Sequence, residues 1–136
     1  MIRKYPTFLT ILKNGMHKGK IMLKKTDVVY LSGPMSDLPD CNIPAFYAAE
    51  KILRNTYGCE VLNPARQPKG LSYCEYMRRA LNDLEWATAV VVLPRALESI
   101  GAGFEIAVAC KKLNLSVYRL DQKDLILLWH GKNSDQ

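Results

Sequence analysis

The sequence is poor in the residues that build metal sites and disulfide frameworks, and it contains no apolar run of membrane-spanning length. Only two of its 136 residues are histidines, and its four cysteines form no Cys-X-X-Cys pair. This spacing fits neither a zinc site nor a dense disulfide framework. The apolar stretch 8–12 is too short for the core of a secretion signal. We therefore expect free thiols, a cytoplasmic location, no membrane partner, and neither a metal nor another cofactor.

Acidic residues are absent from the first 25 positions, which hold seven Lys and Arg. The other 111 residues hold 12 Lys and Arg against 13 Asp and Glu, so their net charge is −1. Nucleic-acid recognition normally uses a basic face of the folded domain, and a nucleic acid bound by the arm is the interpretation we favour least. We expect residues 1–25 to be an arm outside the fold, residues 26–130 to form one domain, and residues 131–136 to be a polar tail.

Short apolar runs alternate along the chain with segments of helical period. Runs typical of buried strands lie at 27–31, 60–62, 89–93 and 116–120. Helical spacing predicts helices at 45–57, 73–87 and 99–113, and we expect a last helix at 121–130. This alternation predicts an α/β fold: a doubly wound, flavodoxin- or Rossmann-like parallel sheet of four to five strands with helices on both faces. Such folds bind ligands at the carboxyl ends of their strands.

The first predicted strand ends in a segment with several candidate binding residues. Tyr30 and Ser36 can offer hydroxyl groups. Gly33, Pro34 and Met35 lie between them and can bring a backbone turn close to a ligand. A Gly-Pro pair after a strand is also common structural punctuation, so this segment alone does not define a site.

The third predicted strand is followed by the segment Ser-Ile-Gly-Ala-Gly-Phe-Glu, residues 99–105. Ser99 can cap the helix that begins here. Gly101 and Gly103 lower its helix propensity, which indicates a close approach to the backbone, and the first amides could hold a phosphate or carboxylate. Glu105 is followed by four apolar residues, and an acid in such surroundings is costly unless it has a partner or a function. A structural glutamate near a helix terminus is the alternative.

The second predicted helix ends in Asp-Leu-Glu-Trp, residues 83–86. Asp83 lies beside the apolar stripe of this helix, from where it could reach the carboxyl edge of the sheet. An exposed helical acid is the alternative, and it is the one we adopt for Glu85. We expect Trp86 to pack against the protein.

The order of these motifs resembles that of a known enzyme family. A strand ending in Gly-Pro-Met, a strand ending in Asn-Pro, a helix with Asp-Leu-Glu-Trp, a valine-rich strand and Ser-X-Gly-X-Gly-X-Glu follow one another over residues 27–120. This set resembles the nucleoside 2-deoxyribosyltransferase family. It is most similar to the branch of 2′-deoxynucleoside 5′-phosphate N-hydrolases and to related small, often phage-borne, proteins.

The resemblance implies roles for four residues. Glu105 would be the nucleophile that attacks the anomeric carbon, Asp83 would assist at the sugar and base, and Tyr30 would orient the nucleophile. Ser99 would contact a 5′-phosphate, with Ser36 as a further candidate. The resemblance also implies a homodimer or larger homo-oligomer in which a neighbouring subunit completes the pocket. The predicted substrate-binding set is Gly33, Pro34, Met35, Ser36, Ser99, Gly101 and Gly103.

These residues suit the cleavage of an N-glycosidic bond. A carboxylate can trap C1′ while an acid helps the base to leave, and a hydrogen bond from Tyr30 would keep the Glu105 carboxylate ionised. We therefore expect an N-glycosidase or deoxyribosyltransferase acting on a (deoxy)nucleoside or its 5′-monophosphate.

Two departures from the family pattern motivate an alternative. Family members usually carry an aspartate where this chain has Thr88, and the loop 93–99 also differs. The alternative is a non-catalytic nucleotide-binding protein, a sensor or sequestering protein, on the same fold.

Overall fold

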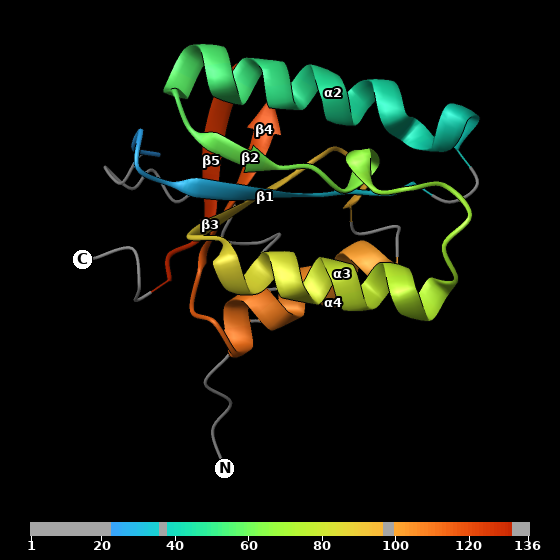
Figure 1. Cartoon of the computed structure of the whole chain (residues 1–136). Helices are drawn as coiled ribbons and strands as arrows, with labels where there is room; N and C mark the ends of the chain where they lie inside the picture. Colours follow the sequence, from blue (N-terminus) through green and yellow to red (C-terminus); the bar gives the residue numbers. More distant parts are fainter. Residues whose placement is uncertain (1–22, 36–37, 97–99, 132–136) are drawn as a thin grey trace.

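A five-stranded sheet forms the centre of the structure, a computed structural model that describes residues 23–35, 38–96 and 100–131 (Figure 1). Short helical turns lie at η1 (Pro39–Asn42), η2 (Leu53–Tyr57) and η3 (Pro64–Arg66). The strands and longer helices are β1 (Val28–Ser32), α2 (Ile43–Ile52), β2 (Glu60–Leu62), α3 (Tyr73–Trp86), β3 (Ala89–Val92), α4 (Ile100–Lys111), β4 (Ser116–Asp121) and β5 (Asp124–Trp129).

The strand order is β2-β1-β3-β4-β5. The first four strands run parallel, and β5 pairs antiparallel with β4. Helix α2 covers one face of the sheet, and α3 and α4 cover the other (Figure 1). The predicted doubly wound α/β fold is thus confirmed, with the flavodoxin-like order. The direction of winding reverses between β1 and β3, so their carboxyl ends form the switch point at which such folds bind ligands.

The central strands are apolar on both sides because both faces of the sheet are covered. Successive side chains of a strand point to opposite faces. Accordingly, Ala89 and Val91 of β3 pack in the cluster beneath α2, whereas Val90 and Val92 pack in the cluster beneath α3 and α4. The same alternation in β1 sends Tyr30 to the α3 and α4 side.

The predicted last helix at 121–130 is wrong, since this segment forms a hairpin with β4. Gln122 adopts a left-handed conformation with φ of 59°, and the turn brings Asp121 opposite Asp124. The apolar run that follows has no helical stripe. Leu125 and Leu127 join one core cluster while Ile126 and Leu128 join the other, which is the period of a strand.

Two side chains differ in burial from what the sequence suggested. Trp86 is 78% exposed, because it lies two positions after the buried Leu84 and therefore points to the opposite side of α3. Leu23, inside the expected N-terminal arm, is buried in the cluster beneath α2.

Within the part of the chain that the structure describes, no helix combines the length and hydrophobicity needed to cross a membrane.

Candidate active site

A buried carboxylate held by two hydroxyl groups lies near the carboxyl end of β1. Tyr30 Oη donates a hydrogen bond of 2.8 Å to Glu105 Oε2, and Ser32 Oγ donates one of 2.7 Å to Oε1. Tyr30 and Ser32 are two positions apart on β1, so both side chains point toward α4. Glu105 is only 4% exposed. Each carboxylate oxygen therefore accepts a hydrogen bond from a different side chain.

Burial changes the acidity of this group. It raises the pKa of Glu105 to about 7, although the hydrogen bonds from Ser32 and Tyr30 lower it. The expected Tyr30 bond forms, but it does not keep the acid fully ionised at neutral pH, because desolvation outweighs both hydrogen bonds. Burial, together with the charge of Glu105, also raises the pKa of Tyr30 well above its ordinary value. The Tyr30 hydroxyl thus stays protonated and remains a donor.

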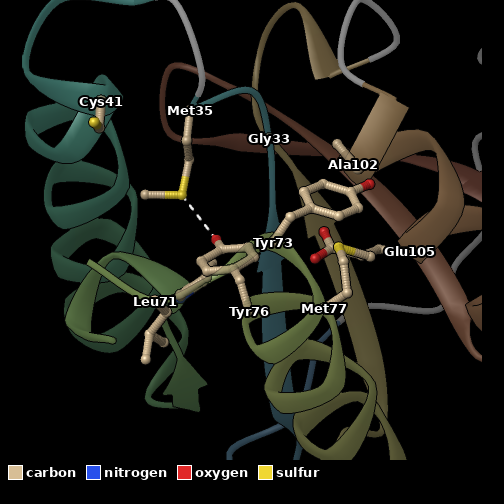
Figure 2. Close-up of a pocket in the computed structure, with 11 residues that line it drawn as sticks. Gly33, Met35, Cys41, Leu71, Tyr73, Tyr76, Met77, Ala102 and Glu105 are labelled. Atoms are coloured by element: carbon tan, nitrogen blue, oxygen red, sulfur yellow. Dashed lines mark hydrogen bonds between the residues drawn. The ribbon is translucent and has the colours of Figure 1, made fainter. Parts of the chain in front are cut away.

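A cavity of about 400 Å³ opens beside Glu105 (Figure 2). This volume lies in the range of small-molecule sites, which are mostly apolar with a few placed polar groups. Glu105 is the only carboxylate among the described residues of the cavity wall. Helix α4 also contributes Gly101 and Ala102, and most of the remaining wall is apolar or aromatic, with Met35, Leu71, Tyr73, Tyr76 and Met77.

The predicted binding residues do not all reach this cavity. Gly33, Met35 and Gly101 line it, whereas Pro34 and Gly103 are buried and are not among its lining residues.

The predicted phosphate contacts Ser36 and Ser99 lie outside the described residues. Gly33 is required by packing, since a β-carbon at this position would lie 3.0 Å from Leu93 Cβ. Its absence lets the ends of β1 and β3 approach each other.

Asp83 does not belong to the described cavity wall. It lies about two helical turns beyond Tyr76 on α3, where Gln67 Nε2 donates a hydrogen bond of 3.5 Å to its carboxylate. Burial raises the pKa of Asp83, and the charge of Arg79 partly opposes this change. The structure thus brings together Tyr30 and Glu105 of the predicted catalytic set and leaves Asp83 outside the cavity.

Thr88 lies at the opposite edge of the sheet. Its hydroxyl donates to Asp27 Oδ1 at 2.7 Å and accepts from the Val28 amide at 2.9 Å. It therefore joins the amino ends of β1 and β3, and the four residues of β3, roughly 13 Å of strand, separate it from the carboxyl edge. Thr88 is therefore not part of the described cavity wall.

Sequence reasoning missed Ser32, which donates to Glu105, and several residues of the cavity wall. The alternation of β1 gave a signal for Ser32, because it places this hydroxyl on the same face as Tyr30. Tyr73, Tyr76 and Met77 lie in the predicted helix 73–87, whose helical spacing favours packing against the core. All three line the cavity, and Met77 is also buried.

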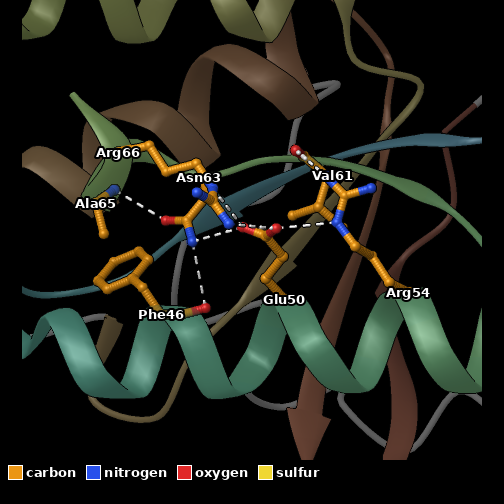
Figure 3. Close-up of polar contacts among 7 residues, drawn as sticks. All are labelled: Phe46, Glu50, Arg54, Val61, Asn63, Ala65 and Arg66. Carbon is orange, nitrogen blue, oxygen red and sulfur yellow. Dashed lines mark hydrogen bonds and ion pairs between the residues drawn. The ribbon is translucent and has the colours of Figure 1, made fainter.

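A second buried carboxylate, that of Glu50, was also missed, and hydrogen bonds from surrounding side chains hold it (Figure 3). Glu50 on α2 accepts hydrogen bonds from Arg66, Arg54 and Asn63. The Arg66 bonds, foremost, lower the pKa of Glu50 to about 2. Asn63 also caps η3 by accepting from the Ala65 amide. This cluster fixes η3, whose Pro64 lines the cavity.

The described residues contain no group of three or more His, Cys, Asp or Glu side chains placed to hold a metal ion. All four cysteines lie in the described part of the chain, and all are free. Cys59 and Cys110 are buried, while Cys41 and Cys74 are exposed.

Comparison with known proteins identifies the family of the chain. The family model described as a domain of unknown function, DUF4406, matches residues 27–119, nearly the range that holds the motifs discussed above. The chain therefore belongs to this family. No curated protein and no solved structure matches it.

Proposed function

We propose that this member of the DUF4406 family is an N-glycosidase or deoxyribosyltransferase that cleaves the base–sugar bond of a (deoxy)nucleoside or its 5′-monophosphate. The observation that supports this most is the Glu105 carboxylate, which is 4% exposed, bonded through both oxygens and located at the wall of a small-molecule cavity. A buried acid without a cationic partner is costly, and such cost is typical of functional groups.

In the proposed reaction, one carboxylate oxygen of Glu105 attacks C1′ of the sugar. The C1′–N bond breaks, its electron pair goes to the base nitrogen, and this nitrogen takes up a proton from solvent, which regains one when water attacks in the second step. Water then attacks the glycosyl-enzyme to give hydrolysis, or a second base attacks to give transfer. Tyr30 and Ser32 hold the carboxylate in one orientation throughout. Only ionised Glu105 can attack, so activity should rise with pH through about 7.

The other parts of the proposal are supported more indirectly. The aromatic and thioether side chains of the wall suit a planar base. In this proposal, Asp83 keeps its predicted role at the sugar and base, although it lies outside the described cavity wall, and Ser36 and Ser99 keep their predicted phosphate contacts. A homodimer would cover the exposed Tyr73 and Phe104 on the neighbouring helices α3 and α4. The free thiols fit the cytoplasm.

Turnover of a panel of nucleosides and their 5′-monophosphates tests the proposal. Free base is measured by chromatography for the wild-type protein and for Glu105→Gln. We expect the substitution to reduce base release at least about a thousandfold, the range seen when a catalytic nucleophile is removed. Glu85→Gln, which changes an exposed glutamate of α3, is the matched control and should retain full activity. Equal base release by Glu105→Gln would remove Glu105 as nucleophile.

One observation favours a second candidate, a non-catalytic nucleotide-binding protein. Glycoside cleavage generally uses two carboxyl groups, whereas the described cavity wall supplies one. Calorimetry beside chromatography separates the two candidates. Tight binding without base release, across the whole panel, would identify a sensor or sequestering protein.

A further inference from the structure

Tyr76 presents a hydroxyl group to the cavity with only a weak partner. Its Oη donates to the Met35 sulfur at 2.8 Å, and both residues line the cavity (Figure 2). A thioether is a weak acceptor, so this donor is bonded less well than a donor to oxygen or nitrogen would be. Tyr76 is half-buried.

The surroundings of Tyr76 keep it a donor. Burial, with a contribution from the charge of Glu105, raises the pKa of this phenol above its ordinary value. The hydroxyl therefore stays protonated at any pH at which the protein is studied. It lies on the first turn of α3, across the cavity wall from the helix that holds Glu105.

We propose that Tyr76 is a substrate-recognition residue whose hydroxyl leaves the Met35 sulfur and donates to an acceptor atom on the edge of a bound heteroaromatic base. The exchange is favourable because a ring nitrogen or carbonyl oxygen is a better acceptor than a thioether. This inference rests on the proposed function and deepens it. The substrate class is a base that presents a lone pair toward α3.

A purely structural role for the Tyr76–Met35 bond makes the opposite prediction for the effect of replacing Met35 on substrate affinity. If the Tyr76–Met35 bond served only to tie the β1 loop to α3, removing either partner should weaken the site equally. If Met35 is only a temporary acceptor, replacing it leaves the Tyr76 donor unpaired in the free protein. Substrate binding then costs no hydrogen bond, and affinity should rise.

Calorimetry with 2′-deoxyadenosine and thymidine provides the test, with all variants made in a Glu105→Gln background to prevent turnover. For the nucleoside that binds more tightly, we expect Tyr76→Phe to weaken binding about tenfold, which is the value of one hydrogen bond. Met35→Leu removes the competing acceptor and should bind up to about threefold more tightly than the parent. Tyr57→Phe removes a hydroxyl that donates to the Lys123 carbonyl away from the cavity, and it should leave affinity unchanged.

The outcomes separate the two proposals. Tyr76→Phe within twofold of the parent, or equal losses for Tyr76→Phe and Met35→Leu, would overturn the recognition role while leaving the enzymatic proposal intact. No binding of either nucleoside, together with no base release by the wild-type protein, would overturn both. Thermal unfolding of each variant confirms that it is folded when its affinity is measured.

Discussion

Replacement of Glu105 by glutamine should make the protein more stable at alkaline pH and have little effect at acidic pH. The amide has nearly the shape of the carboxyl group and can be fully bonded. Tyr30 can donate to its oxygen, and the Ser32 hydroxyl can rotate to accept from its nitrogen. The main change is therefore electrostatic, because glutamine never has to ionise inside the protein.

The magnitude follows from the two pKa values. An ordinary glutamate ionises with a pKa of 4.5, and the folded protein raises that of Glu105 to about 7. Between these values the unfolded chain releases a proton that the folded chain keeps, so wild-type stability falls as pH rises from about 4.5 to about 7 and then stays level. A difference of about 2.5 between the pKa values costs about 3 kcal/mol. The glutamine variant does not lose this free energy.

Denaturant unfolding of both proteins between pH 4 and pH 8.5 measures the effect. Relative to its value at pH 4, the stability difference between variant and wild type should shift by about 3 kcal/mol in favour of Glu105→Gln at pH 8. In thermal unfolding, the same change corresponds to roughly 10 °C in Tm for a chain of this size. Glu85→Gln is the control and should show no such dependence. A stability difference that is constant over this range would refute the assigned cause.

Three further predictions concern individual polar groups. Glu50→Gln should show the opposite pH dependence, because the folded protein lowers the pKa of Glu50 to about 2. It should lose about 2 kcal/mol of unfolding free energy at pH 7, after allowance for the half-exposed arginines, and the loss should vanish as pH falls toward 2. Ser32→Ala should raise the pKa of Glu105, since the Ser32 hydrogen bond lowers that pKa. The acid limb of the pH–rate profile should then move to higher pH, and Ser32→Thr should restore the wild-type profile. Thr88→Ala should lower the free energy of unfolding by about 1 kcal/mol in denaturant, because the bonds to Asp27 and Val28 are lost. It should leave base release unchanged. A loss of activity in the folded variant would contradict the assignment of Thr88 to the amino edge of the sheet.

The fold followed from the sequence because its core elements obey simple periodicities. The apolar runs of β1 and β3 and the helical stripe of α3 each indicated one type of element, and their alternation fixed the topology. The run 125–129 was harder to assign, because an apolar segment without polar interruptions shows no period of its own. Its strand character depends on the turn at Gln122 and on the two covered faces of the sheet.

The site was predictable to the extent that topology alone determines it. Tyr30 lies in β1 and Glu105 on the helix that follows the neighbouring parallel strand β3, so their meeting at one edge could be inferred. Ser32 was equally accessible through the alternation of β1. The position of Asp83 outside the cavity could not be inferred from the sequence, since it depends on which turn of α3 faces the cavity. The Glu50–Arg66 pair joins α2 to η3 across the intervening η2 and β2, and no spacing in the sequence indicates it.

A mass measurement of a trapped glycosyl-enzyme tests the role of Glu105 most directly. A nucleoside with fluorine at the sugar 2′ position destabilises the oxocarbenium-like transition state and allows an intermediate to accumulate. We expect one equivalent of free base and a mass increase of one fluorinated sugar on the peptide that contains Glu105. Release of base with no sugar attached, or with the sugar on another residue, would contradict Glu105 as the nucleophile.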